Sequence, residues 1–386
     1  MAPMDDRPSI ARSTADRLEA IARGGGMPRA IVGFDGFVDH IKHMVASRTS
    51  MAPREYHRIR TIGEFAARCA AAAGKSTNIE QVPLESRFGG NGPLMAGALA
   101  SLGMATTFIG AIGDGAVEPV FERFARRCEE VFPICASSHT DCLEFEDGKL
   151  MFNDTGAMQR VTWDLVTQRV GLARLREIFG RSALLGVVNW SLLGGVEAIW
   201  RGLARDVLPG LAGGRRMFVD LSDPAKRTDA DIGAMLELLG ELERTLALTL
   251  GLNLAEAQRI ARVVGLRPLG DSPAGAEIAH AAGELRARLG LDCVVIHPRH
   301  GAAAGTASGG GAWFDGPLAT HPRLSTGAGD HFNAGFALAQ VLGLGLGECL
   351  ACAVATSGAY VRDAVSPSLP RLCEFLRDLP APAESV

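Results

Sequence analysis

The chain has 386 residues, of which 47% are hydrophobic, and carries a formal net charge of −4 at pH 7. This length and composition suit one large α/β domain with a small appendage, or two domains, and give ample capacity for a core. The mild acidity and the lack of a dense run of Lys and Arg argue against a surface that binds nucleic acid.

Strand and helix patterns alternate along most of the chain. A polar helix is expected at residues 13–23, and a short apolar strand follows at residues 30–34. Later strands are expected at 106–112, 130–134, 183–188, 217–220, 245–249 and 293–297, and helices at 92–102, 117–127, 195–205, 229–243, 254–264, 275–289, 334–342 and 346–361. Strands separated by helices imply right-handed crossovers, so we predict an α/β fold with a mostly parallel sheet covered on both faces.

Two stretches interrupt this alternation. Residues 139–153 alternate apolar and polar side chains around a turn at 146–148, which is typical of a β-hairpin. Residues 40–88 contain a helix candidate at 62–73 and a strand-like segment at 78–82. We expect these insertions to meet over the carboxyl edge of the sheet as a small lid on the ligand crevice. The Gly-rich run at residues 305–311 is typical of a hairpin turn.

The cysteines and the hydropathy pattern bear on location. The eight cysteines are scattered, as expected of reduced thiols, and the single Cys-x-x-Cys (Cys349 and Cys352) lies in a helical run where core packing is favoured over zinc binding. No apolar run is long enough to span a membrane, and residues 1–6 lack the basic segment followed by an apolar segment that is typical of a signal peptide. We therefore expect a cytoplasmic protein with no membrane partner.

Two carboxylates follow the first strand, in the segment Gly33-Phe34-Asp35-Gly36-Phe37-Val38-Asp39. The end of a parallel strand faces the crevice in which α/β folds bind ligands. Asp39, close to the lid segment, is the stronger candidate for binding ligand hydroxyls. A loop Asp is most often only solvated, so this assignment depends on the motifs that follow.

Glycines precede the expected helix at 92–102, in Gly89-Gly90-Asn91-Gly92. They permit close approach of a polar ligand, and Asn91 offers both a donor and an acceptor to hydroxyl groups. Taken alone, an N-capping role for Asn91 is the favoured interpretation.

A third motif is Asn253-Leu254-Ala255-Glu256, which opens a helix. Asn253 and Glu256 have the spacing of a capping pair. Alternatively, Glu256 holds waters on a magnesium ion near phosphates. Both roles are compatible with the sequence.

The fourth motif is Ser325-Thr326-Gly327-Ala328-Gly329-Asp330, ahead of a long apolar helix pattern. Small residues let backbone N–H groups approach an anion at a helix N-terminus, where the helix dipole is favourable. A carboxylate beside such an anion makes sense if Asp330 accepts a proton from a hydroxyl that attacks a phosphoryl group. The alternative is a Gly-rich turn capped by Asp330. His331 follows the proposed base and could line the same site.

Together and in this order, the four motifs resemble those of the ribokinase-like family of carbohydrate kinases, also called the PfkB family. The resemblance covers residues 31–360, and Gly89-Gly90-Asn91 and Gly327-Ala328-Gly329-Asp330 are its most specific signatures. It implies one three-layer α/β/α domain over residues 25–380, with a mostly parallel central sheet. A small β lid would come from residues 40–88 and 137–158, and residues 1–24 would form an N-terminal extension.

The resemblance also implies Mg²⁺- and ATP-dependent phosphorylation of a hydroxyl on a sugar, sugar acid or nucleoside. Asp330 would be the general base, and the N–H groups of Gly327, Ala328 and Gly329 the anion hole. The substrate would be held by Asp35, Asp39, Gly89, Gly90 and Asn91. The nucleotide would be held by Asn253, His297, Arg299, Gly301, Thr326, Gly327 and Gly329, and magnesium would be organised by Glu256. Phosphoryl transfer needs positioning, neutralised charge and a proton acceptor, so the residue types favour the same assignments.

Three departures from the family pattern qualify these roles. Leu324 stands where many members carry an Asp of a monovalent-cation site, which argues against potassium activation. The interval from Gly33 to Asp39 is one residue longer than expected, and His297 ends the nucleotide-side strand. These two features resemble those of ADP-dependent sugar kinases, whereas the Gly-Ala-Gly-Asp motif and the chain length favour ATP as the phosphoryl donor.

A non-catalytic protein that binds a sugar or nucleoside on the same fold is the other alternative. The oligomeric state also stays open, because an exposed lid sheet could pair two copies of the chain or remain alone.

Overall fold

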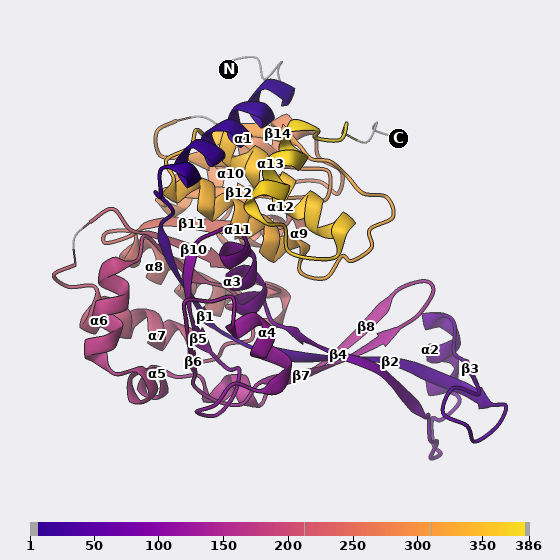
Figure 1. The fold of residues 1–386 in the computed structure, drawn as a ribbon. Coiled ribbons are helices and arrows are strands. Elements are labelled where there is room, and N and C mark those ends of the chain that lie inside the picture. Colours follow the sequence, from indigo (N-terminus) through magenta and orange to yellow (C-terminus); the bar gives the residue numbers. More distant parts are fainter. Residues whose placement is uncertain (1–6, 212, 310, 383–386) are drawn as a thin grey trace.

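A nine-stranded sheet forms the centre of the computed structural model, which describes residues 7–211, 213–309 and 311–382 (Figure 1). Seven neighbouring strands run parallel, and the last two form an antiparallel hairpin at one edge. In spatial order the strands are β14 (Gly311–Asp315), β13 (Gly301–Thr306), β12 (Cys293–Ile296), β11 (Ala247–Leu252), β10 (Arg216–Asp220), β9 (Leu184–Val187), β1 (Arg29–Phe34), β5 (Ala105–Gly110) and β6 (Glu130–Pro133). The predicted parallel sheet is confirmed, and Gly305 pairs with Gly311 across the predicted hairpin.

Helices cover both faces of this sheet because successive strand residues point to opposite sides. In β1, Ile31 belongs to one apolar core while Ala30 and Val32 belong to the other. The first core packs under α5 (Trp163–Val170), α6 (Leu172–Arg181), α7 (Val196–Gly202), α8 (Asp229–Leu242), α9 (Leu254–Val263) and α10 (Gly275–Leu289). The second packs under α1 (Arg7–Arg23), α3 (Asn91–Ser101), α4 (Glu122–Ala125), α11 (Ala328–Val341), α12 (Leu346–Asp363) and α13 (Leu369–Arg377). Short helical segments are η1 (Pro119–Phe121), η2 (Ala157–Arg160), η3 (Leu203–Val207) and η4 (Pro224–Lys226). The architecture is the predicted three-layer α/β/α arrangement.

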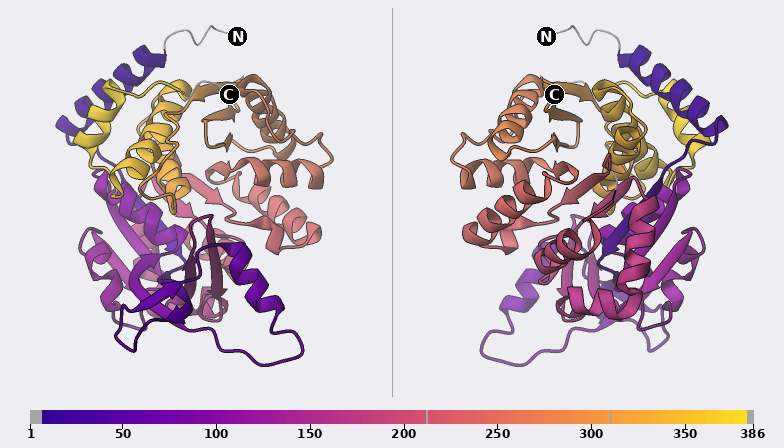
Figure 2. Two further views of the ribbon diagram at one scale, coloured as in Figure 1. Left: turned by 90° about the vertical axis from the view of Figure 1, so that its right-hand side faces the viewer. Right: turned by 90° about the vertical axis from the view of Figure 1, so that its left-hand side faces the viewer.

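A second, five-stranded sheet projects from the body as an arm (Figures 1 and 2). Its central strand pairs with one strand on each side and with a third near its far end. The elements are β2 (Phe37–Arg48), β3 (Tyr56–Arg58), β4 (Gln81–Gly89), β7 (Ser138–Glu144), β8 (Lys149–Asp154) and α2 (Ile62–Ala70). The two segments predicted to form a lid therefore meet in one sheet, through the parallel pairing of β2 with β7.

The helix α1 packs into the body, although residues 1–24 were expected to form an extension. It buries Ala11, Thr14, Ala15 and Leu18, and it contacts α12 and α13. Arg377 of α13 donates to Glu19 at 2.7 Å and to Asp16 at 2.8 Å. The described part of α1 thus belongs to the second core. Residues 1–6, on which the expectation about a signal peptide rests, lie outside the described residues.

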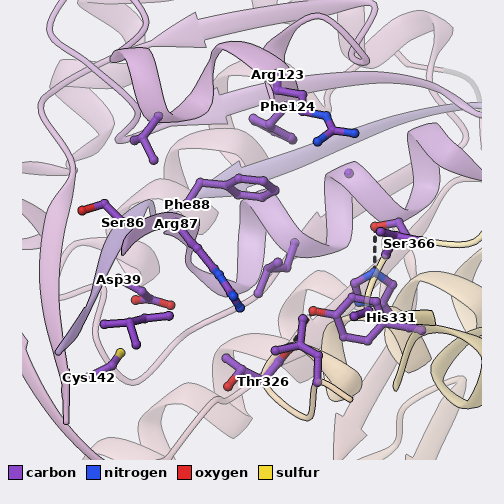
Figure 3. A pocket seen from close by; sticks show the side chains of 18 of the residues that line it. Asp39, Ser86, Arg87, Phe88, Arg123, Phe124, Cys142, Thr326, His331 and Ser366 are labelled. Atoms are coloured by element: carbon purple, nitrogen blue, oxygen red, sulfur yellow. Dashed lines mark hydrogen bonds between the residues drawn. The ribbon is translucent and has the colours of Figure 1, made fainter. Parts of the chain in front are cut away.

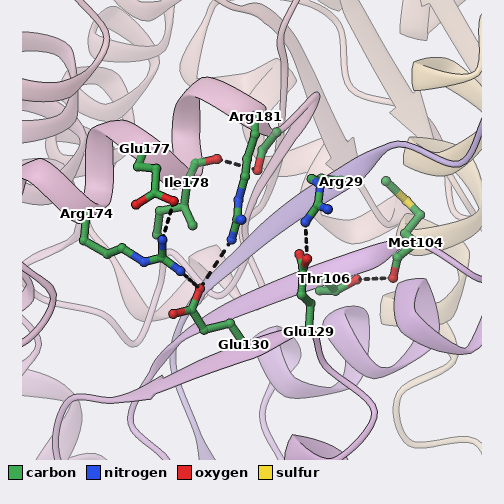
Figure 4. Close-up of polar contacts among 10 residues, drawn as sticks. Arg29, Met104, Thr106, Glu129, Glu130, Arg174, Glu177, Ile178 and Arg181 are labelled. Carbon is green, nitrogen blue, oxygen red and sulfur yellow. Dashed lines mark hydrogen bonds and ion pairs between the residues drawn. The ribbon is translucent and has the colours of Figure 1, made fainter.

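Ion pairs lie at the amino ends of the strands, away from the motifs singled out above (Figure 4). Glu130 at the start of β6 accepts from Arg174 at 2.6 Å and from Arg181 at 3.4 Å, and Arg29 pairs with Glu129. Such partly exposed pairs each contribute little to stability, but this group ties α6 to the edge of the sheet. The carboxyl ends of the strands are left for the polar residues of the site.

Two further expectations concern cysteines and membranes. Cys349 and Cys352 are buried in α12 with free thiols, in agreement with the predicted packing role. Within the described ranges, no helix combines the length and apolar character needed to cross a bilayer.

Candidate active site

The predicted anion cradle lies at the N-terminus of α11. Gly327 is its N-cap with a φ of 85°, a left-handed conformation that favours glycine. The N–H group of Ala328 donates to the carbonyl of Ser325 at 3.2 Å, whereas no hydrogen bond from the Gly327 or Gly329 N–H group is found in the described part of the chain. Two of the three predicted N–H groups are therefore available to an anion, and that of Ala328 is engaged.

The two most specific motifs meet at one hydrogen bond. The side-chain amide of Asn91, the first residue of α3, donates to Oδ1 of Asp330 at 2.9 Å, although the residues are 239 positions apart. Asp330 is only 5% exposed. Burial, followed by the charge of Asp220, raises the pKa of Asp330 well above its ordinary value, and the Asn91 bond opposes this shift. Asp330 is thus a buried carboxyl group with a raised pKa, held through one oxygen by Asn91.

Asp35 lies beneath this contact and is 0% exposed. Its Oδ2 accepts from the Asn91 N–H at 2.9 Å and from the side-chain amide of Asn189 at 2.8 Å, while Oδ1 accepts from the Gly92 N–H at 2.7 Å. Burial raises the pKa of Asp35 to about 6 despite these three bonds. Asp35, expected to bind the substrate, has no exposed surface, and both of its carboxylate oxygens accept hydrogen bonds from the protein. It fixes the start of α3 and so positions Asn91.

Asp39 occupies the base of the lid, where β2 pairs with β4. A Cβ atom on Gly89 would lie 2.5 Å from Oδ2 of Asp39, so a larger residue there would displace the Asp39 carboxylate. Gly90 follows with a φ of 94°. Burial raises the pKa of Asp39 above its ordinary value. Asp39 lines a pocket of about 470 Å³ between the lid and the body (Figure 3).

Three further side chains brace the anion cradle: His331, which the sequence analysis named, and Lys149 and Tyr360, which it did not. The Tyr360 hydroxyl donates to the carbonyl of Thr326 at 2.8 Å, and Nζ of Lys149, from the lid, donates to Oγ1 of Thr326 at 3.0 Å. His331 lies against Tyr360 with ring centroids 3.5 Å apart, and its Nδ1 donates to the carbonyl of Gly327 at 2.7 Å. The carbonyls of Thr326 and Gly327 are therefore held, which orients the peptide planes that contain the N–H groups of Gly327 and Ala328.

A separate cavity of about 460 Å³ lies on the other side of the cradle. Of the predicted nucleotide-binding residues, those that line it are Asn253, His297, Arg299, Gly301 and Gly329; Thr326 lines the other pocket instead. Nε2 of His297 is buried and has no partner in the described residues. Burial lowers the pKa of His297 to about 4, so the imidazole is neutral. A cavity of this size with an unpartnered ring nitrogen fits a nucleotide.

Glu256 has the expected capping geometry and also lies beside a second acid. Its Oε2 accepts from the Asn253 N–H at 2.7 Å, and Oδ1 of Asn253 accepts from the Glu256 N–H at 3.0 Å. Glu256 is 4% exposed, and burial together with the charge of Asp220 raises its pKa well above the ordinary value. Asp220, which the sequence analysis missed, accepts from the side-chain amide of Asn333 at 2.8 Å.

The carboxylates of Glu256 and Asp220 are oxygen ligands of the kind that magnesium takes together with nucleotide phosphates. No group of three or more acidic, His or Cys side chains in the described residues could hold a metal alone. Mg²⁺ prefers oxygen ligands and usually takes one or two carboxylates, with waters and substrate phosphates completing its shell. Glu256 and Asp220 satisfy that requirement, and a cation would relieve their mutual repulsion.

The fold and the site define a ribokinase-like carbohydrate kinase. Among solved structures of this fold, the Arabidopsis thaliana ribokinase complexed with ribose and ATP matches with a TM-score of 0.61 and 18% identity, covering 91% of this chain and 99% of that one. The Cryptococcus neoformans ribokinase in complex with ADP matches with a TM-score of 0.64 and 17% identity, covering 90% and 99%.

Sequence comparison identifies the family more closely. The family model for prokaryotic ketohexokinase matches residues 8–379, so the chain belongs to the prokaryotic ketohexokinase family. A ketohexokinase of Haloferax volcanii is 31% identical over 354 residues, which cover 90% of each chain. The protein is therefore a phosphotransferase of the carbohydrate kinase class.

Proposed function

We propose that this protein is an ATP- and Mg²⁺-dependent ketohexokinase that transfers the γ-phosphoryl group to a hydroxyl of a ketohexose. The observation that carries the proposal is the 2.9 Å contact between Asn91 and Asp330. It joins the substrate-binding motif to the proposed base at the N-terminus of α11. Family membership supports the choice of a ketose among sugars.

In this mechanism Asp330 accepts the proton of the attacking hydroxyl. Its burial raises its pKa and so makes the carboxylate a stronger base than an exposed Asp. Asn91 holds one carboxylate oxygen, which leaves the other for the sugar. Asp39, Gly90 and Asn91 orient the sugar, so the reacting hydroxyl approaches in a fixed direction.

The N–H groups of Gly327 and Gly329 stabilise the negative charge on the migrating phosphoryl group, aided by the dipole of α11. The Ala328 N–H group would join them only after its bond to Ser325 opens. Glu256 and Asp220 would hold magnesium through water, and the ion would neutralise phosphate charge. His297 and Arg299 line the cavity that would receive the nucleotide.

A panel of acceptors and donors tests this proposal. We expect the kcat/KM for fructose with ATP to exceed that for glucose, ribose or adenosine by at least about tenfold. Replacing ATP with ADP as the donor should abolish most of the activity. Preferred phosphorylation of an aldose or a nucleoside would contradict the ketohexose assignment. Preferred use of ADP would contradict the donor assignment alone.

The Glu256→Gln substitution tests the metal role. Glutamine can still accept the Asn253 N–H bond, so the helix cap should persist, but the charge near the metal is lost. We expect the Mg²⁺ concentration at half-maximal rate to rise about tenfold, in the range found for groups that act on a metal indirectly. Initial rates measured against Mg²⁺ at saturating sugar provide the value.

Glu277→Gln is the matched control. Glu277 occupies the same capping position in α10, accepts from the Ala274 N–H at 2.7 Å and is exposed. Its replacement should leave the Mg²⁺ requirement unchanged. If the two variants have the same Mg²⁺ dependence, Glu256 is only a helix cap.

A further inference from the structure

The pocket beside Asp39 carries positive charge to which the proposed mechanism assigns no role. Its walls come from lid strands, α3, the region of α4 and residues 323–326 and 360–366. It contains five cationic side chains, Arg87, Arg123, Arg127, Lys149 and Arg323, but only two carboxylates, Asp39 and Glu144. Positive charge is thus concentrated here in a chain whose net charge is −4.

Three of these cations have no counter-charge in the protein. Within the described ranges, Arg123, Arg127 and Arg323 form no ion pair and no side-chain hydrogen bond. The lid cations differ, since Arg87 pairs with Glu85 and Lys149 lies 3.8 Å from Glu144. Arginines that line one pocket without partners are suited to an external anion.

The rest of the wall is apolar. Phe88 and Phe124 stack with centroids 5.7 Å apart, and Leu94 of α3 lines the same pocket. Figure 3 shows Phe88 and Phe124 near Arg123, and Arg87 reaching toward the space between Asp39 and His331. A ligand that matches both parts of the wall has a carbon body and a strongly anionic end.

We propose that this pocket binds a small phosphate ester. Its phosphate is held by Arg123, Arg127 and Arg323, and its carbon body lies over Phe88, Leu94 and Phe124. A phosphate dianion satisfies several guanidinium groups better than a single carboxylate does, because it offers more acceptor oxygens and more charge. The nucleotide cavity shares no lining residue with this pocket, so the ester site is distinct from it.

Phenyl phosphate is the probe, because it joins an aromatic body to a phosphate. Calorimetric titration uses the full chain saturated with a non-hydrolysable ATP analogue, which fills the nucleotide cavity. We expect saturable binding of phenyl phosphate, weakened at least about tenfold in the Arg123→Ala/Arg127→Ala variant. Both arginines are exposed, so the variant should fold, and circular dichroism checks this.

Arg126→Ala is the control. Arg126 lies between the two substituted positions, pairs with Glu122 at 3.2 Å and does not line the pocket, so its loss should not change the Kd. Phenylacetate and inorganic phosphate should both bind more weakly than phenyl phosphate. The proposal is overturned if the native chain shows no saturable binding, if the double variant binds as well as the native chain, or if phenylacetate binds equally well. None of these outcomes depends on turnover, so they are distinguishable from a failure of the proposed kinase activity.

Discussion

The Asp330→Asn variant should lose at least about a hundredfold in turnover, because an amide cannot accept the hydroxyl proton. The substitution is otherwise conservative, since the new side chain can still accept the bond from the Asn91 amide. The binding of sugar and nucleotide should therefore remain close to normal. Steady-state kcat and the separate Kd values for the two substrates test this expectation.

The same variant should be more stable than the native protein at neutral pH. Burial raises the pKa of Asp330, so the folded protein binds this proton more tightly than the unfolded chain does. The native protein therefore loses stability as the pH rises from the ordinary Asp value toward the raised one, and the loss is constant above it. The gain in Tm from Asp330→Asn should be absent near pH 3.8, increase with pH, and then level off.

Asp292→Asn supplies the control for Asp330. Asp292 is a half-buried carboxylate at the amino end of β12 and pairs with Arg216 at 2.6 Å, far along the strands from the site. Its replacement should leave turnover unchanged. Near-normal turnover in Asp330→Asn would remove Asp330 from the role of base.

The meeting of distant motifs could be predicted from the sequence because the fold is parallel. Gly89-Gly90-Asn91 and Gly327-Ala328-Gly329-Asp330 both introduce helices on one face of the sheet, and helix starts in such folds gather at the carboxyl edge of the strands. The glycines marked positions of close approach, which the sequence analysis assigned to a ligand; in the structure Gly89 meets Asp39 and Gly327 adopts a positive φ. Local signals thus predicted the arrangement of the cradle.

Some elements escaped prediction for physical reasons. The strand β2 (Phe37–Arg48) is long, yet its polar residues His40, Lys42 and His43 obscure the alternation of apolar side chains. Its pairing partners on both sides, β4 and β7, stabilise it instead. The helix expected at residues 117–127 is only η1 and the short α4, and Pro119 begins the first of these. Tertiary pairing therefore decided β2 more than local propensity did.

The side-chain contacts that support the anion cradle become visible only in the folded structure. Lys149, Tyr360 and His331 reach the cradle from the lid, from α12 and from α11 itself. A lysine in a hairpin and a tyrosine in an apolar helix carry no signal of such roles. The burial of Asp35 was likewise hidden, because a strand-end carboxylate is equally compatible with solvent, ligand or backbone donors.

Asp35→Ala should destabilise the protein and also impair catalysis. It leaves three donors without an acceptor, namely the partly buried N–H group of Asn91 and the buried Gly92 N–H group and Asn189 amide. We expect the free energy of unfolding to fall by about 2–5 kcal/mol, allowing for relief of the buried charge. The Asn91 amide would lose its fixed position against Asp330, so kcat should fall as well. Urea unfolding and steady-state kinetics measure the two effects.

The pH dependence and a neighbouring acid separate this positioning role from sugar binding. Because the pKa of Asp35 is raised to about 6, ionisation costs the native protein stability between the ordinary Asp value and that pH. Asp35→Ala should therefore destabilise more at pH 5 than at pH 7. Asp35→Asn keeps one acceptor oxygen, so it should lose less stability and remains measurable if the alanine variant does not fold.

Asp39→Ala, by contrast, should raise the KM for the sugar at least about tenfold with little change in the free energy of unfolding. If Asp35→Ala instead raises only the sugar KM and unfolds like the native chain, Asp35 contacts the substrate after all.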